Sequence, residues 1–328
     1  MLVKEPSVSC NIIADSDHYD QEITLADPKG FRVGDGITLI AKDAHSNGRN
    51  YFQGTLVARS GNRFKLDRPL QKNFWVVGDA KAGTIFPLLL CRSVADVTIE
   101  NVTLDGNKTN NENLHPQEWE GCISLSESNR ITIRQVTARN ENGDGMVWEY
   151  SHDVLVENCH SHDHVYFGLH PGSGSQRSIL RGNQLRNNDI GIYYCWGAKY
   201  GLATKNVIED SRRYGISVGH CDTDNLIRDN DVRRNGQTGI LLSGGDNDAP
   251  HRTRLERNRI VDSGSEKGIA IDVQGGTASA TLSQNELRET RQPLSRIGIR
   301  IGPQTRDIRC IDNQVEGFAT ALLDLHTT

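Results

Sequence analysis

Amide side chains recur along this chain at nearly even intervals. Nine positions carry Asn or, once, Gln, and each is followed within two residues by Val, Ile, Leu or Cys. The intervals run from 23 to 28 residues after a first one of 34. A period of this size is typical of stacked structural repeats. The positions are Asn101, Gln135, Asn158, Asn183, Asn206, Asn230, Asn258, Asn285 and Asn313.

A second series of positions runs in step with the first and marks short strands. Two of these strands read Gly-Ile-Tyr-Tyr (191–194) and Gly-Ile-Ser-Val (215–218). Apolar residues lie one and three places after the glycine, so alternate side chains point inward. The series consists of Cys122, Gly145, Gly168, Gly191, Gly215, Gly239, Gly268 and Gly298.

Each repeat has room for three short strands. In one repeat we expect strands at 215–218, at 225–228 and around Val232. No segment shows a sustained 3.6-residue apolar period, so helices are minor. Three short strands cannot bury a core alone, but they can when turns of the chain stack at about 4.8 Å and pair in parallel. Asn favours turns in general, but stacked amides can also bond to one another, which explains nine in register. We predict an all-β, single-stranded parallel β-helix, a solenoid of about 8 to 10 coils.

This pattern resembles the pectate-lyase-like superfamily of right-handed parallel β-helices. The resemblance rests on the Asn series and the Gly-Ile-x-Ile/Val strands, and it covers about residues 86–328. It implies the fold and its right-handed coil. Because the superfamily includes lyases, hydrolases, epimerases, esterases, tailspikes and non-catalytic proteins, it leaves the activity open.

Residues 1–85 lack the repeat. Residues 31–40 and 62–67 read as short antiparallel strands with Gly and Asn turns. We predict an N-terminal β cap that hides the edge of the first coil. No comparable cap follows Phe318, so we expect a further segment or another subunit, in a homo-oligomer, to cover the last coil.

Composition excludes several classes. A net charge of −5 without a basic run argues against a nucleic-acid partner. The longest apolar run, 86–91, is too short to span a membrane, and the N-terminus lacks the features of a signal peptide. These features leave the localisation unknown. The seven cysteines lack metal-ligand spacing, and Cys195 with Cys221 is the pair best placed for a bridge if any forms.

Outward positions of the first strands gather rings on three consecutive repeats. Substrates of this superfamily lie along that strand face and its loops. Tyr and Trp suit stacking on a sugar ring, although such rings can also simply cover a sheet. The predicted carbohydrate groove contains His170, Tyr193, Trp196 and His220, with Glu149 and Arg300 toward its ends and Asp272 in the same row.

Two acidic loops follow on neighbouring repeats. Asp222 and Asp224 precede Asp246 and Asp248 by 24 residues each. We expect each pair to stack at about 5 Å, close to the separation in retaining glycosidases, while diagonal pairs approach the roughly 6.5–9.5 Å of inverting ones. Crowding raises one pKa and creates a general acid beside an ionised base. The catalytic candidates are Asp222, Asp224 and Asp246, with His220 and His170 orienting the substrate or moving protons.

Two other interpretations of these loops stay open. Their carboxylates could bind Ca²⁺, which a lyase would use to neutralise an acidic sugar, with Lys199, Arg213 or His220 as the base. Asp and Asn also bond to backbone amides in ordinary turns.

Two weaker motifs complete the sequence signals. Residues 215–220 and 142–145 are similar to the Gly-His-Gly and Asn-Thr-Asp elements of polygalacturonases, but the match is partial because the Asp-Asp and Arg-Ile-Lys motifs of that family are not recognisable. His160, His162 and His164 would share one face of an extended segment and could hold Zn²⁺, or could simply form a polar loop.

The leading interpretation is a glycoside hydrolase that acts on a polysaccharide or oligosaccharide without a cofactor. The first alternative is a polysaccharide lyase or epimerase, with Ca²⁺ if the reaction depends on it. The second is a non-catalytic carbohydrate-binding or tailspike-like structural protein.

Overall fold

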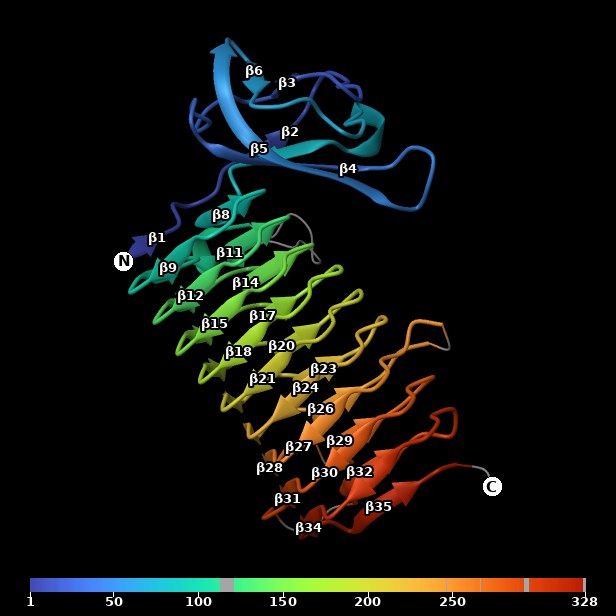
Figure 1. Cartoon of the computed structure of the whole chain (residues 1–328). Coiled ribbons are helices and arrows are strands. Elements are labelled where there is room, and N and C mark those ends of the chain that lie inside the picture. The colour runs from blue at the N-terminus through green and yellow to red at the C-terminus, as the bar shows by residue number, and fades with distance from the viewer. Residues whose placement is uncertain (113–120, 246, 266, 292–294, 327–328) are drawn as a thin grey trace. The chain divides into compact units, whose positions relative to one another are not determined.

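The computed structural model describes residues 1–112, 121–245, 247–265, 267–291 and 295–326, and its chain divides into two compact units (Figure 1). One unit consists of Val3–Pro87 and the segment that begins at Asn107. The other consists of Met1–Leu2, Leu88–Gly106 and the chain after that segment. It contains the coils.

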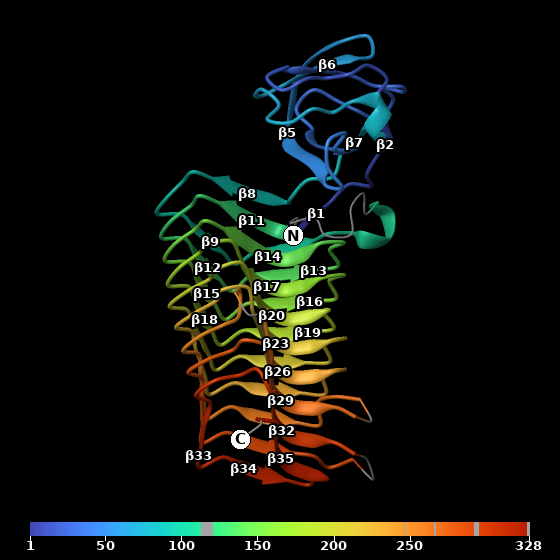
Figure 2. The ribbon, with the colours of Figure 1, turned by 90° about the vertical axis from the view of Figure 1, so that its right-hand side faces the viewer.

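The coiled unit is a solenoid of three parallel sheets, in which each strand pairs with its counterpart one turn earlier and one turn later (Figure 2). Sheet 1 contains β8 (Leu89–Arg92), β11 (Gly121–Ser126), β14 (Asp144–Glu149), β17 (Phe167–Pro171), β20 (Ile190–Tyr194), β23 (Tyr214–Val218), β26 (Thr238–Leu242), β29 (Ile269–Val273), β32 (Ile297–Ile301) and β35 (Thr320–Asp324).

Sheets 2 and 3 form the other two walls. Sheet 2 contains β9 (Thr98–Glu100), β12 (Thr132–Arg134), β15 (Leu155–Glu157), β18 (Ile179–Arg181), β21 (Leu202–Thr204), β24 (Leu226–Arg228), β27 (Arg254–Glu256), β30 (Thr281–Ser283) and β33 (Arg309–Ile311). Sheet 3 contains β1 (Leu2–Val3), β10 (Thr103–Asp105), β13 (Thr137–Arg139), β16 (His160–His162), β19 (Gln184–Arg186), β22 (Val207–Glu209), β25 (Asp231–Arg233), β28 (Arg259–Val261), β31 (Glu286–Arg288) and β34 (Gln314–Glu316).

Inward residues of sheet 1 stack in register from turn to turn. Ile192 pairs with Ile216, which pairs with Ile240, and all three are fully buried in the core. The glycine before each of them is required by the close approach of the walls. A Cβ on Gly215 would lie 2.5 Å from Val232 Cγ1 and 2.6 Å from the carbonyl oxygen of Gly239. The predicted pattern therefore faces the core. In β29, however, Ala270 and not Gly268 is in register with Gly239 and Gly298, so that member of the series was placed two residues too early.

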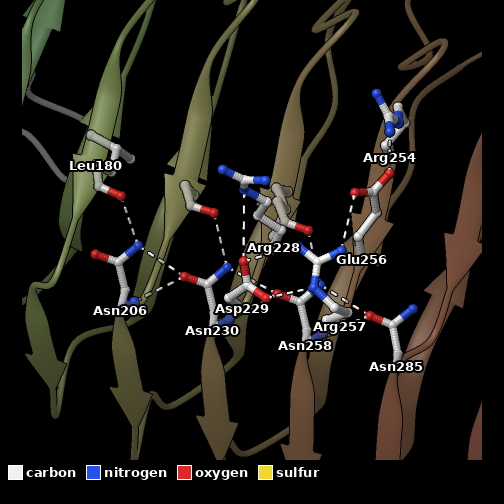
Figure 3. Close-up of polar contacts among 12 residues, drawn as sticks. Leu180, Asn206, Arg228, Asp229, Asn230, Arg254, Glu256, Arg257, Asn258 and Asn285 are labelled. Carbon is white, nitrogen blue, oxygen red and sulfur yellow. Dashed lines mark hydrogen bonds and ion pairs between the residues drawn. The ribbon is translucent and has the colours of Figure 1, made fainter.

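A ladder of buried amides runs along the corner between sheets 2 and 3 (Figure 3). Each Asn Nδ2 donates to the Oδ1 of the next Asn at 2.9 to 3.0 Å, and also to a backbone carbonyl of the preceding turn. The same Oδ1 accepts the backbone N–H of its neighbour, as Asn230 does from Asn206 at 3.0 Å. The ladder consists of Asn183, Asn206, Asn230, Asn258, Asn285 and Asn313.

The first three predicted members are not part of this ladder. Asn101, Gln135 and Asn158 lie one residue earlier in their turns and have positive φ angles of 52 to 54°. Asn183 Oδ1 instead accepts the N–H of buried Cys159. The interval of 25 residues between Asn158 and Asn183 reflects this shift, because neighbouring coils there differ by 24 residues.

Ion pairs between neighbouring coils line the outside of the corner between sheets 1 and 2. They join Asp96 to Arg130, Asp153 to Arg177 and Asp224 to Arg252, each through two contacts of 2.7 to 2.9 Å. All six residues have left-handed backbone, with φ from 54 to 60°. Exposed pairs of this kind stabilise a fold only slightly.

The N-terminal unit has its own antiparallel sheet and its own core of buried residues, including Phe31, Phe64 and Phe74. The strands expected near 31–40 and 62–67 are present as β4 and β6. The capping role stays a prediction. Its elements are β2 (Ser9–Asn11), β3 (Glu22–Thr24), β4 (Gly36–Lys42), β5 (Arg49–Ser60), β6 (Arg63–Leu66), β7 (Lys81–Gly83) and the 3₁₀ turns η1 (Val76–Gly78) and η2 (Lys108–Asn110).

Apolar side chains of the last described coil are exposed. Ile311, Leu322 and Leu325 show 45%, 48% and 40% of their surface. The expected homo-oligomer through this coil stays a prediction. Within the described ranges, no helix is long and apolar enough to cross a membrane.

Replacing Asn230 with Ala should destabilise the coils strongly. The substitution removes the side chain that accepts the N–H of Asn206 and donates to the carbonyl of Ala203 in the core, and each such loss costs about 1–3 kcal/mol. Thermal unfolding measures the effect. Asn158→Gly is the matched control, because Asn158 is exposed and glycine accepts its positive φ. Equal melting temperatures for both variants would contradict the role of the ladder.

Candidate functional site

A buried histidine–aspartate pair lies on the outer face of sheet 1. His170 of β17 points outward, opposite to the inward Leu169, and its Nδ1 lies 2.7 Å from Asp144 Oδ2 of β14. Asp144 Oδ1 also accepts the backbone N–H of Phe167 at 3.0 Å. The two side chains are only 4% and 3% exposed. The carboxylate therefore fixes both the ring of His170 and the start of its strand.

Tyr193 of β20 covers this pair one coil further along. Its ring centroid lies 4.3 Å from that of Phe167 and 5.2 Å from that of His170. The Cys195 thiol interacts with both Tyr193 and His170. Tyr193 is half-buried, and its ring lies over those of Phe167 and His170 with planes tilted by 44° and 47°.

Charges and burial shift three pKa values here. Burial lowers the pKa of His170, but the Asp144 carboxylate and its hydrogen bond outweigh this and raise the pKa to about 10. Burial and the neighbouring Cys195 raise the pKa of Tyr193, so the phenol keeps its proton. Burial also raises the pKa of Glu149, although the charge of His170 acts in the opposite direction.

His220 and Trp196 form the exposed rim of the site. Their rings stack at 5.1 Å with planes 7° apart. His220 Nδ1 lies 3.5 Å from the Tyr193 hydroxyl and 3.6 Å from Cys195 Sγ. Trp196 is 59% exposed, and Tyr150, which is 62% exposed, occupies the same corner two coils earlier. The site therefore joins a buried ion pair to exposed rings through Tyr193.

Asp222 holds the turn beside this rim. Its Oδ1 accepts the backbone N–H groups of Gly197 and Ala198 at 2.9 and 2.7 Å, and its Oδ2 accepts that of Gly219 at 3.0 Å. Ser151 and Ser175 perform the same task in earlier coils. Burial raises the pKa of Asp222 to about 8, although the backbone bonds lower it.

The expected stacking of Asp224 on Asp248 is wrong. Asp224 forms a double ion pair with Arg252, which lies 28 residues later, because this coil is longer than the preceding ones. The side-chain hydrogen bond from Arg252 lowers the pKa of Asp224. Asp246 lies outside the described residues. The described acids of the two loops are therefore not brought together as a glycosidase pair.

The other predicted residues are spread along the coils. Glu149 and Arg213 lie near the site, since Glu149 interacts with His170, and Arg213 interacts with Tyr193 and bonds Asp189 at 2.8 Å. Asp272 and Arg300 pair with each other at 2.6 Å and lie three and four coils beyond Tyr193, about 14 and 19 Å away at the spacing of coils. Lys199 lies on the other side of the corner, bridged to Gln176.

The histidine segment does not form a metal site. His160 and His162 lie on one face of β16, but His164 follows the turn at Asp163 and is fully buried, with its Nε2 3.1 Å from Ser161 Oγ. In the parts of the chain that the structure describes, no three acidic, His or Cys side chains are grouped to hold a metal. All seven cysteines, Cys195 and Cys221 included, are free.

The sequence did not reveal the partnership of Asp144 with His170. The residues are 26 apart, and the signal was available only from the register, which places Asp144 beside Phe167, three residues before His170. Tyr150 lies five places after Gly145, as Trp196 does after Gly191, so the spacing that revealed Trp196 could also have revealed Tyr150.

Asp144→Asn should lower thermal stability in a pH-dependent way. The pair raises the pKa of His170 from 6.5 to about 10, so its stabilisation is complete below pH 6.5 and is lost as the pH rises through 10. The melting temperature of the variant should therefore fall several degrees below that of the natural protein at pH 6, with a gap that closes toward pH 10. A gap that is constant across this range would contradict the ion pair.

Comparisons with known proteins agree on the fold. The family described as "Right handed beta helix region" matches residues 88–249 and 121–287. No curated protein matches the chain. The surface protein and adhesin PfbA of Streptococcus pneumoniae is 14% identical with a TM-score of 0.54, over 70% of this chain and 76% of that one. Alginate lyase from a Paenibacillus species is 12% identical with a TM-score of 0.52, over 71% and 88%.

A phage protein was also found. The tailspike gp49 of Pseudomonas phage LKA1 is 10% identical with a TM-score of 0.41, over 98% of this chain, which spans 64% of the tailspike. Such low identities concern the fold alone. Together with the family match over more than half of the residues, the stacked parallel sheets show that this chain belongs to the right-handed β-helix family.

Proposed function

We propose that the protein acts on an acidic polysaccharide or oligosaccharide by proton transfer, as a lyase or epimerase. The observation that carries the proposal is the contact of the Tyr193 hydroxyl with His220 Nδ1 at 3.5 Å, beneath the exposed ring of Trp196. This places a phenol and an imidazole side by side on a surface suited to a sugar.

The two reactions share a first step that fits these groups. A base removes the proton on the carbon next to the sugar carboxylate. In a lyase, an acid on the same side then protonates the leaving oxygen, which two groups 3.5 Å apart can do. An epimerase would need a further proton donor on the opposite face of that carbon. His220 serves as the base, because it is the partly exposed imidazole. Tyr193 serves as the acid, because its raised pKa keeps the phenol protonated. Catalytic hydrogen bonds are often long before substrate binds, so 3.5 Å suits this role.

His170 and Asp144 are positioning residues in this scheme. Their ion pair is inaccessible, but it packs against the Tyr193 ring and so fixes where the hydroxyl lies.

The exposed rings supply the binding surface. Trp196 stacks on His220, and Tyr150 lies on the same corner about 10 Å away at the spacing of two coils. Flat aromatic faces at this separation can each contact a sugar ring of one chain. Alginate lyase shares the fold, which makes alginate the first acidic polysaccharide to test.

Hydrolysis is the second candidate. Glu149 is a carboxylic acid whose pKa is raised by burial, a property of general acids in glycosidases. It lies one coil from His170, in the strand that pairs with β17.

A panel of acidic and neutral polysaccharides distinguishes the candidates. We expect acidic substrates to give a product with ultraviolet absorbance, from the double bond formed by elimination, or an epimerised sugar detected by NMR. New reducing ends without absorbance would favour hydrolysis. Binding without any product would contradict an enzymatic role and favour a carbohydrate-binding protein. A parallel series with a chelator tests for Ca²⁺.

Tyr193→Phe and His220→Gln should each lower kcat about 10²–10⁴-fold, as expected for the loss of a general acid or base. Neither should lower the melting temperature by more than a few degrees, because both side chains lie on the outer face. Tyr200→Phe is the matched control, since Tyr200 is 56% exposed on a corner outside the site. Natural turnover in both variants would remove the assignment.

A further inference from the structure

The N-terminal unit contains two cavities that share Lys42. They have volumes of about 280 and 330 Å³ and lie where β4 ends and β5 begins. The first is lined by, among others, His18, Lys42, Asp43, His45, Lys72 and Trp75. The second is lined by, among others, Lys42, Arg49, Asp79, Lys81 and Glu112.

The first cavity has a rigid aromatic wall. The half-buried Trp75 donates its indole N–H to Asp17 Oδ1 at 2.7 Å, and the His45 ring lies edge-on to it at 5.7 Å. Asn50 Nδ2 donates to the carbonyl of Asn73 at 2.8 Å, which joins β5 to the segment that carries Trp75. The ring is therefore fixed in place before any ligand arrives.

Cations outnumber available anions along the two cavities. Lys72, Arg49 and Lys81 make no ion pair with any residue in the described ranges. Asp79 pairs with Lys42. Asp43 and Glu112 accept hydrogen bonds from the N–H of His45 and from Ser9 Oγ and keep their charge, so three unpaired cations face two carboxylates. The cavities thus form a basic track beside an aromatic ring.

We propose that this track binds an anionic oligosaccharide. Trp75 would stack on one sugar ring, and Lys72, Arg49 and Lys81 would bind its carboxylates or sulfates. Each volume lies near the lower end of the range for ligand pockets, which suits one or two sugar units per cavity. The choice of ligand class rests on the proposed function. The site itself consists only of residues of the N-terminal unit.

Charge reversal at Lys72 tests the site in the full-length protein. Lys72→Glu should weaken binding of alginate and polygalacturonate oligosaccharides about tenfold, as for one lost charge-assisted bond. Lys29→Glu is the matched control, an exposed lysine of the same unit outside both cavities. Calorimetry measures both, with dextran as the neutral ligand. Equal affinities for the two variants, or no binding of either acidic ligand by the natural protein, would overturn the inference.

The double variant Tyr193→Phe/His220→Gln separates this inference from the proposed function. In the double variant, Lys72→Glu should still weaken binding. In the otherwise natural protein, Lys72→Glu should leave kcat on short oligosaccharides unchanged. If Lys72→Glu weakens binding but the natural protein shows no turnover, the site is supported and the enzymatic proposal is rejected. If the double variant loses turnover but Lys72→Glu leaves binding unchanged, the enzymatic proposal is supported and the binding site is rejected.

Discussion

Pairing between successive turns of the chain is the constraint on which the coiled unit depends. Backbone bonds join each strand to the next turn, but they alone would tolerate a shift by two residues. The side-chain amides of Asn183 to Asn313 do not tolerate such a shift, because each Asn must meet both the N–H and the amide of its neighbour. Glycines such as Gly215 add a steric condition, since any other residue at that point would contact the next wall. Core packing and polar pairing thus specify the same register.

The register also creates the site. Asp144, Phe167, His170, Tyr193 and His220 come from four turns, and no two of them are near in sequence except Phe167 and His170. They meet because each strand of sheet 1 begins at the same height in its coil. Extra residues enter at the corners, as in the turn between Asp224 and Arg252, so the strands keep their alignment while the loops beside them vary.

The repeat, the three strands and the inward positions could all be predicted from the sequence, because they follow from local periodicity. The ladder was misplaced by one residue in three coils, since Asn favours both the buried position of Asn183 and the left-handed position of Asn158. Among the site residues, His170, Tyr193, Trp196 and His220 do lie together. Asp222 and Asp224 were assigned to catalysis because of their equal spacing from the next acidic loop. In the structure, Asp222 accepts backbone N–H groups and Asp224 pairs with Arg252, because the coil is longer than the spacing implied.

The charged pairs outside the corner between sheets 1 and 2 make the coils distinguishable from one another. Asp96, Arg130, Asp153 and Arg177 alternate in sign from turn to turn. Removal of the turn that contains Arg130 would place Asp96 beside Asp153. Duplication of any one of these turns would likewise place two like charges side by side. Although each pair adds little stability, the alternation favours the natural neighbour over a turn that presents a like charge in these coils. Growth or shortening of the solenoid during evolution would then proceed most easily by two turns at a time.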